Sequence, residues 1–346
     1  MLMPTIIALF RRRYLLVCAL LFACPVLATA ASFDCNIAKT ALEKTICADP
    51  KLSAEDAEMT QRYNRARSLL SDQGKSILRS GQQQWLKLIK VLCLDYKRTE
   101  GATACLRRQY EERMDNLETA AVQIGPYLFS RVDGYTSPGV NGQTGKPLEQ
   151  HIGLPRIDQP LSVDAERWNA LIVRLSGAMQ ANWCYGQFQT ADAKDSDTLS
   201  EQMLNFKVFA QGAFINVKFT HFEQCGAGAP DVEVSNLSYF MGPPLRPLTA
   251  ADLFLQGKPW TSLLAAQAWR EFNLADLDSG AQKDLRDGVN KVISDPAAWS
   301  FTEQGLVITF APGYGGASLA SGPVDLTIPW KNLYPFVTST APIPGH

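Results

Sequence analysis

Residues 75–93 read KSILRSGQQQWLKLIKVLC and give the clearest structural signal in the chain. The apolar residues of this stretch recur at helical spacing up to Cys93; they are Leu78, Trp85, Leu88, Ile89 and Leu92. An apolar stripe with a period near 3.6 residues is typical of an amphipathic helix that buries one face. We therefore expect a long helix here, with Trp85 in a hydrophobic core.

Two further helical stripes flank this helix. The first has apolar or aromatic residues three and four positions apart, namely Met59, Tyr63, Ala66 and Leu70, and Ser53 with Asp56 resembles a capping box at its start. The second runs from Leu106 to Ala121 and includes Arg113, whose stem is expected to cover apolar surface. With a short helix near residues 38–46, these stripes predict a small helical bundle over residues 31–121.

The first 30 residues have the features of a secretory signal peptide. Three arginines at 11–13 precede an apolar stretch, and Ala28 to Ala30 form an A-x-A cleavage site. The apolar part is broken by Pro25 and is shorter than the roughly 20 residues that a membrane span needs. We predict cleavage after residue 30 and a periplasmic or secreted protein without a membrane span. Lipid attachment at Cys24, after the lipobox-like Leu21-Phe22-Ala23, and twin-arginine export are alternatives.

Removing residues 1–30 leaves six of the eight cysteines, an even number that favours disulfides in an exported protein. Local pairing is the simplest of the 15 connectivities that six cysteines allow. It predicts three disulfides, which join Cys35 with Cys47, Cys93 with Cys105, and Cys184 with Cys225. The sequence contains no CxxC and no HxxxH spacing, so no metal site is predicted.

The second half of the chain has a different pattern. Residues 122–160 carry six glycines and five prolines, which predicts a linker and an irregular entry into a second domain. Residues 161–346 then mix helical stripes with short apolar runs; helices are expected at 164–179, 260–272 and 282–293, and strands at 206–209, 215–219, 232–240, 306–310 and 324–328. This order predicts an α+β domain with a largely antiparallel sheet, folding separately from residues 31–121.

Composition excludes several classes of function. There are 33 Lys and Arg against 34 Asp and Glu, so the net charge of -1 provides no positive field for binding nucleic acid. The three histidines, at 151, 221 and 346, are far apart, and no GxSxG or Walker motif is present. His221 lies in an expected strand and is interpreted as a packing residue. We therefore predict no catalytic residues, no cofactor and no enzymatic activity.

The N-terminal half carries a recognisable order of residues. Trp85 and Leu86 precede the third of four cysteines, while Tyr110, Arg113 and Leu117 follow the fourth. This pattern, over about 85 residues, resembles the N-terminal domain of LprI-type lysozyme inhibitors. The resemblance implies a disulfide-bonded helical fold and lysozyme binding. The sequence departs from the family at residues 89–90, where Ile and Lys replace the usual Arg and Asp.

The C-terminal half has a looser resemblance. The residues that carry it are Pro155-Arg156-Ile157 with Trp168-Asn169, the run from Leu248 to Phe254, Phe310-Ala311-Pro312, and Ser321-Gly322-Pro323 through Trp330. They are similar to the domain shared by the anti-sigma factor RsiV and the non-catalytic part of the deacetylase PdaC. Relatives often have a Gly-Gly-Ala-His turn, and here Met241-Gly-Pro-Pro244 has no histidine. In RsiV this domain is a lysozyme receptor.

These features predict an exported envelope protein that binds lysozyme or another muramidase-like protein. The alternative is a non-catalytic accessory module of peptidoglycan processing, which would bind glycan or an envelope enzyme. Lysozymes of the c-type are basic, so the region 122–346, with 15 basic and 21 acidic side chains, is expected to carry most of the binding. The expected contact is its glycine-rich loop, with Tyr314, Gly315, Gly316 and Ser318.

Overall fold

A computed structural model describes residues 31–95, 101–137, 149–180, 201–224, 230–272, 279–312 and 322–345. Its N-terminal part is helical, as predicted, with α1 (Ala41–Ala48), α2 (Pro50–Leu69), α3 (Asp72–Ile89) and α4 (Ala102–Glu118). A 3-10 turn at Cys35–Ile37 precedes α1, and a π-helical segment at Lys90–Asp95 follows α3. Within the described ranges, no helix is both long enough and apolar enough to cross a membrane. The signal-peptide prediction lies outside these ranges.

The helices begin where local chemistry satisfies their first backbone N–H groups. The first, α1, starts with a reciprocal capping box, and Asp49 caps α2 with Pro50 in the first turn. The capping box predicted at Ser53 and Asp56 is wrong, because α2 begins earlier and Ser53 lies inside it. The Ser53 hydroxyl instead donates to the carbonyl oxygen of Ile46 at 2.8 Å, which joins α2 to α1.

The helical part is closed by two of the three predicted disulfides. Cys35–Cys47 joins the 3-10 turn to α1, and Cys93–Cys105 joins the π-helical segment to α4. Trp85 is 1% exposed and lies in the core of the helices, as predicted. The predicted pair of Cys184 and Cys225 lies outside the described residues.

The rest of the chain forms an α+β region, in agreement with the predicted fold class. Within the described residues, its main sheet has seven strands in sequence order, antiparallel except for the parallel pair β3–β4. The strands are β1 (Ala121–Ile124), β2 (Tyr127–Thr136), β3 (Glu149–Gln159), β4 (Glu201–Gln211), β5 (Phe214–Gln224), β6 (Asp231–Phe240) and β7 (Arg246–Pro247).

The prediction of a linker and an irregular domain entry over residues 122–160 is wrong. Strands β1, β2 and β3 occupy most of the described part of this segment. A proline is tolerated at position 155 because β3 pairs with β4 only from Glu149 to Ile152, so one side of β3 has no partner there among the described strands. Whether residues 31–121 fold on their own stays a prediction.

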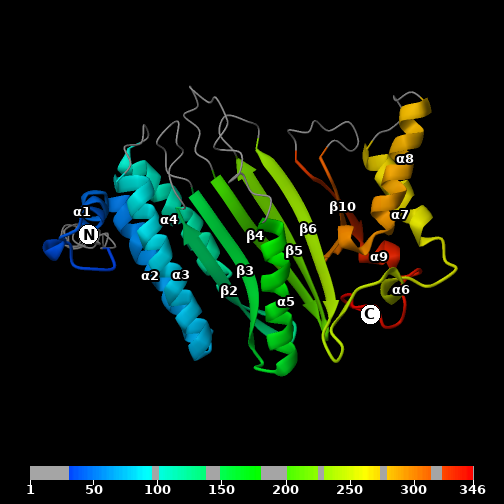
Figure 1. Cartoon of the computed structure of the whole chain (residues 1–346), viewed down its shortest axis with the longest axis horizontal. Coiled ribbons are helices and arrows are strands. Elements are labelled where there is room, and N and C mark those ends of the chain that lie inside the picture. Colours follow the sequence, from blue (N-terminus) through cyan, green and yellow to red (C-terminus); the bar gives the residue numbers. More distant parts are fainter. Residues whose placement is uncertain are drawn as a thin grey trace, which may run out of the picture.

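Figure 1 shows the helices α2, α3 and α4 beside the β2 end of the sheet, with α5 (Val163–Gln180) across one face. A second, three-stranded sheet lies beyond β6, in the order β10 (Val324–Pro329), β9 (Gly305–Phe310) and β8 (Trp299–Phe301). The helices packed near it are α6 (Ala250–Leu253), α7 (Trp260–Phe272), α8 (Ser279–Ser294) and α9 (Trp330–Leu333). A 3-10 turn, Pro296–Ala298, leads from α8 into β8.

The two faces of β5 separate two hydrophobic cores. Ile215 and Val217 pack in the same core as Trp168 of α5. The alternate residues face the small sheet: Phe214 packs against Phe301 of β8, with ring centroids 4.8 Å apart. This alternation follows from the pleat of a β-strand, and it places the helix and the small sheet on opposite sides of β5.

Candidate functional site

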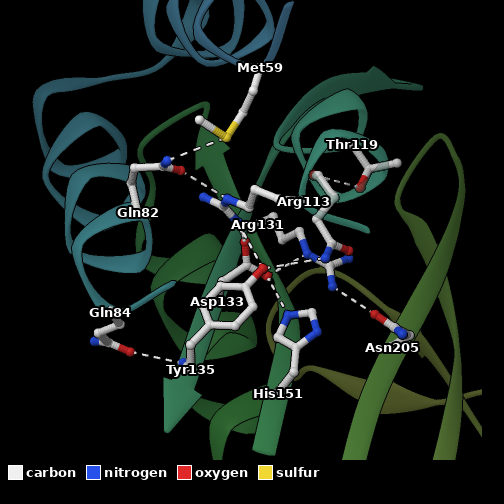
Figure 2. Close-up of polar contacts among 11 residues, drawn as sticks. Met59, Gln82, Gln84, Arg113, Thr119, Arg131, Asp133, Tyr135, His151 and Asn205 are labelled. Carbon is white, nitrogen blue, oxygen red and sulfur yellow. Dashed lines mark hydrogen bonds and ion pairs between the residues drawn. The ribbon is translucent and has the colours of Figure 1, made fainter. Parts of the chain in front are cut away.

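A buried cluster of charged side chains lies where α3 and α4 pack against β2 and β3 (Figure 2). Asp133 is at its centre. One carboxylate oxygen accepts from Nη1 of Arg113 at 2.6 Å, and the other accepts from Nε of Arg131 at 2.5 Å. Nε2 of His151 lies 3.2 Å from the second oxygen. All four residues are less than 10% exposed, so the cluster is shielded from water.

Polar neighbours extend this cluster to five elements. Nε of Arg113 donates to Gln82 of α3, and Nη2 of Arg131 donates to Asn205 of β4 at 2.7 Å. The Tyr135 ring stacks on the imidazole of His151, with centroids 4.3 Å apart. The cluster therefore fixes the helices on the sheet through directional contacts, as a hydrogen-bonded buried network does.

Two glycines make room for this arrangement. A Cβ atom at position 81 of α3 would lie 3.3 Å from the Asp133 Cβ atom, so Gly81 allows the helix to lie close to β2. A Cβ at position 153 of β3 would overlap the Arg131 guanidinium, which lies over Gly153. Both glycines are used for close approach rather than for backbone freedom.

The charges of the cluster are mutually compensated. Burial alone would raise the pKa of Asp133. The positive charge of Arg131, a hydrogen bond from His151 and the positive charge of Arg113 outweigh this effect and hold the pKa far below its usual range. Burial lowers the pKa of His151, and its contact with Asp133 only partly offsets this effect. The carboxylate is therefore ionised, and the imidazole is neutral at pH 7.

The histidine gives the fold a pH dependence. Because its pKa is lower in the folded state than the usual 6.5, the unfolded chain takes up the proton first. The free energy of unfolding is therefore expected to fall as the pH drops below about 6.5, before Asp133 is protonated. In a His151→Gln variant the stability should change less between pH 7 and pH 5, as measured by urea unfolding at each pH. An unchanged slope would contradict this assignment.

A second buried carboxylate joins the helices to β3. Asp158 is 0% exposed and accepts from the backbone N–H and the hydroxyl of Ser71, both at 2.7 Å. The same hydroxyl caps α3 by accepting from the backbone N–H of Gly74. A Cβ at position 74 would lie 2.6 Å from an Asp158 carboxylate oxygen. The start of α3 is therefore held directly on the sheet.

Carboxylates also gather on the exposed side of the helices. Glu111, Asp115 and Glu118 are exposed along α4 at spacings of four and three, so they share one face. Glu58 on α2 faces the same region, because Arg62 forms ion pairs with both Glu58 and Glu118, at 2.6 and 3.3 Å. We call these four acidic residues the α2/α4 acidic face.

A further acidic group, made of Glu112, Glu149 and Glu201, lies where α4 meets β3. Burial, together with the charges of Glu149 and Glu201, raises the pKa of Glu112 to about 7. Glu149 is buried and accepts from the Gln109 side chain at 2.7 Å. Among the residues that the structure describes, no cluster has the composition of a metal site.

The buried cluster contains none of the residues that the sequence predicts as a binding site. The loop residues Tyr314, Gly315, Gly316 and Ser318 fall outside the described residues. His221 lies on β5, opposite Leu204 of β4. Arg113, expected to cover apolar surface, is instead fully buried in the ion cluster. The signal for the cluster was the alternation Arg131-x-Asp133-x-Tyr135, which puts three polar residues on one face of a strand.

Comparison with known proteins finds a family model that matches the helical part. Residues 35–117 match the model described as "Lysozyme inhibitor LprI". The match spans α1 to α4 almost completely and includes both described disulfides. No curated protein matches the chain.

Two solved structures are similar over most of their own length. One is a DUF3298 family member from Bacteroides fragilis, with 13% identity, a TM-score of 0.40, and coverage of 63% of this chain and 96% of that chain. The other is a DUF3298 family protein from Pseudomonas aeruginosa PAO1, with 16% identity, a TM-score of 0.42, and coverage of 64% and 98%.

Proposed function

We propose that this chain is an exported protein of the cell envelope that binds lysozyme. The observation that carries the proposal is the match of residues 35–117 to the lysozyme inhibitor family. The disulfides support export, because such bonds persist mainly in oxidising compartments. The resemblance of the C-terminal half to the RsiV receptor domain favours the same ligand.

The α2/α4 acidic face is the proposed contact within the matched part of the chain. Its four carboxylates outnumber the two basic side chains that pair with them, Arg62 and Lys51, so the face presents a net negative charge to a basic partner. Complementary charge increases the rate of association. The acidic region 122–346, with the loop residues Tyr314 to Ser318, is proposed as the other contact and is expected to carry most of the binding. The acidic face and the loop are separate in sequence, so variants can test them independently.

Binding is expected between the mature chain, residues 31–346, and a c-type lysozyme, and isothermal titration calorimetry measures it. Since charge complementarity contributes, the affinity should fall as salt shortens the Debye length from about 10 Å at 0.1 M to about 3 Å at 1 M. A muramidase assay on the same samples separates inhibition from binding alone. No binding to lysozyme, together with capture on isolated peptidoglycan, would overturn the proposal in favour of the accessory-module alternative.

Charge-reversal variants locate the contact. Changing Glu111, Asp115 and Glu118 to lysine is expected to weaken lysozyme binding about tenfold or more, because like charges then face each other. The matched control reverses three exposed carboxylates of the helical part that lie outside this face: Asp34, Asp72 and Asp95. It changes the net charge equally, so an equal loss in both variants would contradict a local contact at the acidic face. A Tyr314→Ala variant tests the loop in the same way.

A further inference from the structure

A cleft of about 530 Å³ lies between the main sheet and the small sheet, away from the acidic face. One wall is β6, from Asp231 to Asn236. The other wall is formed by the end of α8, the turn that follows it, and the end of β9; its residues include Lys291, Asp295, Ala298, Phe310 and Pro312. The cleft is large enough for several residues of an extended polypeptide.

The β6 wall is a sheet edge. On one side β6 pairs with β5 along its whole length, but on the other side β7 pairs only with Tyr239 and Phe240. The Ser238 carbonyl accepts from Leu248 on this outer side. Backbone groups alternate in direction along an antiparallel strand, so those of Val232, Val234 and Asn236 also point outward. Within the described residues, no backbone hydrogen bond reaches them.

A buried polar atom and an acidic lining indicate what this edge would accept. Asn236 is 7% exposed, and its side-chain oxygen has no hydrogen-bond partner within the described residues. Burying such an acceptor without a donor costs about 1–3 kcal/mol. Three carboxylates and one lysine line the cleft, namely Asp231, Glu233, Asp295 and Lys291. The cleft therefore offers hydrogen-bond acceptors and a negative field.

We propose that this cleft binds an extended, cationic segment of a partner protein, which pairs with β6 as an added strand. The outward N–H and C=O groups of β6 supply main-chain hydrogen bonds, as in other cases of strand addition. The carboxylates of the lining attract lysine or arginine side chains of the segment. The proposal does not depend on lysozyme as the partner, because it rests only on the edge, the cleft and its charge.

The probe is a fluorescent eight-residue peptide of alternating valine and lysine, titrated against the mature chain by anisotropy. Two matched peptides separate the contributions: one is N-methylated at alternate residues, and one has glutamate in place of lysine. Each is expected to bind at least tenfold more weakly than the parent peptide. Failure of the parent peptide to bind at 1 mM, or equal binding by the N-methylated peptide, would overturn the proposal.

Protein variants test the same pairing from the other side. Val234→Pro removes one outward N–H without breaking the ladder to β5, and it is expected to weaken peptide binding about tenfold. The control Val234→Ala keeps that N–H and should bind within about threefold of the parent chain. Equal losses in both variants would show that side-chain packing, not strand pairing, holds the peptide, and would contradict the proposal.

Hydrogen exchange provides a readout that needs no variant. The outward amides of Val232, Val234 and Asn236 are expected to exchange at least tenfold more slowly when the peptide is bound. Amides of β1, the opposite edge of the main sheet, serve as the internal reference. Peptide binding that leaves exchange in residues 231–236 unchanged would place the peptide elsewhere and overturn the assignment.

Discussion

Replacing Asp133 by alanine is expected to lower the free energy of unfolding by about 3–5 kcal/mol. The change removes the carboxylate that compensates two guanidinium groups, Arg113 and Arg131, whose side chains are 0% and 4% exposed. Removing one partner of a buried ion pair leaves an uncompensated charge in a region that water does not reach. The measurement is urea unfolding at pH 7, followed by circular dichroism.

The control for this prediction is Asp72→Ala. Asp72 forms an ion pair with Lys75 at 3.2 Å, but its side chain is fully exposed, so the loss should stay within about 1 kcal/mol. A loss of that small size for Asp133→Ala as well would mean that water solvates the two arginines. The description of the Asp133 cluster as shielded from water would then be wrong.

Loss of the Cys93–Cys105 disulfide is expected to cost about 3–5 kcal/mol. The two described disulfides have the same sequence separation of 12 residues, so the chain-entropy contribution, about 3 kcal/mol, is equal for both. Their surroundings differ: Cys93 and Cys105 are 3% and 0% exposed, whereas Cys35 is exposed. Replacing these two core cysteines leaves a cavity, and this cost adds to the gain in conformational entropy of the unfolded chain.

The double variants Cys93→Ala with Cys105→Ala and Cys35→Ala with Cys47→Ala form a matched pair. The first should lose at least about 1 kcal/mol more stability than the second, because only the first leaves a cavity. Urea unfolding without reductant measures the difference. Equal losses would show that chain entropy alone accounts for both disulfides.

Local features of the helical part were predictable because their causes lie within a few turns of chain. The stripe that includes Trp85 predicts both a helix and a buried face, and the structure has both. The two short-range disulfides belong to this class, since a separation of 12 residues favours local pairing. The misplaced start of α2 shows the limit: Ser53 and Asp56 have the residue types of a cap, but Asp49 before Pro50 provides a better one.

The strands at 127–136 and 149–159 were missed for a different reason. The number of glycines and prolines in residues 122–160 does not decide whether strands form there; the positions of these residues relative to the partner strands do. Gly153 is required because the Arg131 side chain lies over it, and Pro155 lies where one side of β3 has no partner in the described part of the sheet. Neither condition exists until the strands have paired.

The order of residues predicts the helical N-terminal part, its local disulfides and the α+β class of the remainder, because helical periodicity and short chain closures depend on neighbouring residues. The Asp133 cluster and the free edge of β6 form only when distant helices and strands pack together. The cluster unites Gln82, Asp133 and Asn205, and the edge exists because β7 is only two residues long. Strand register and the ends of pairing are set by contacts between distant residues, which no local pattern specifies.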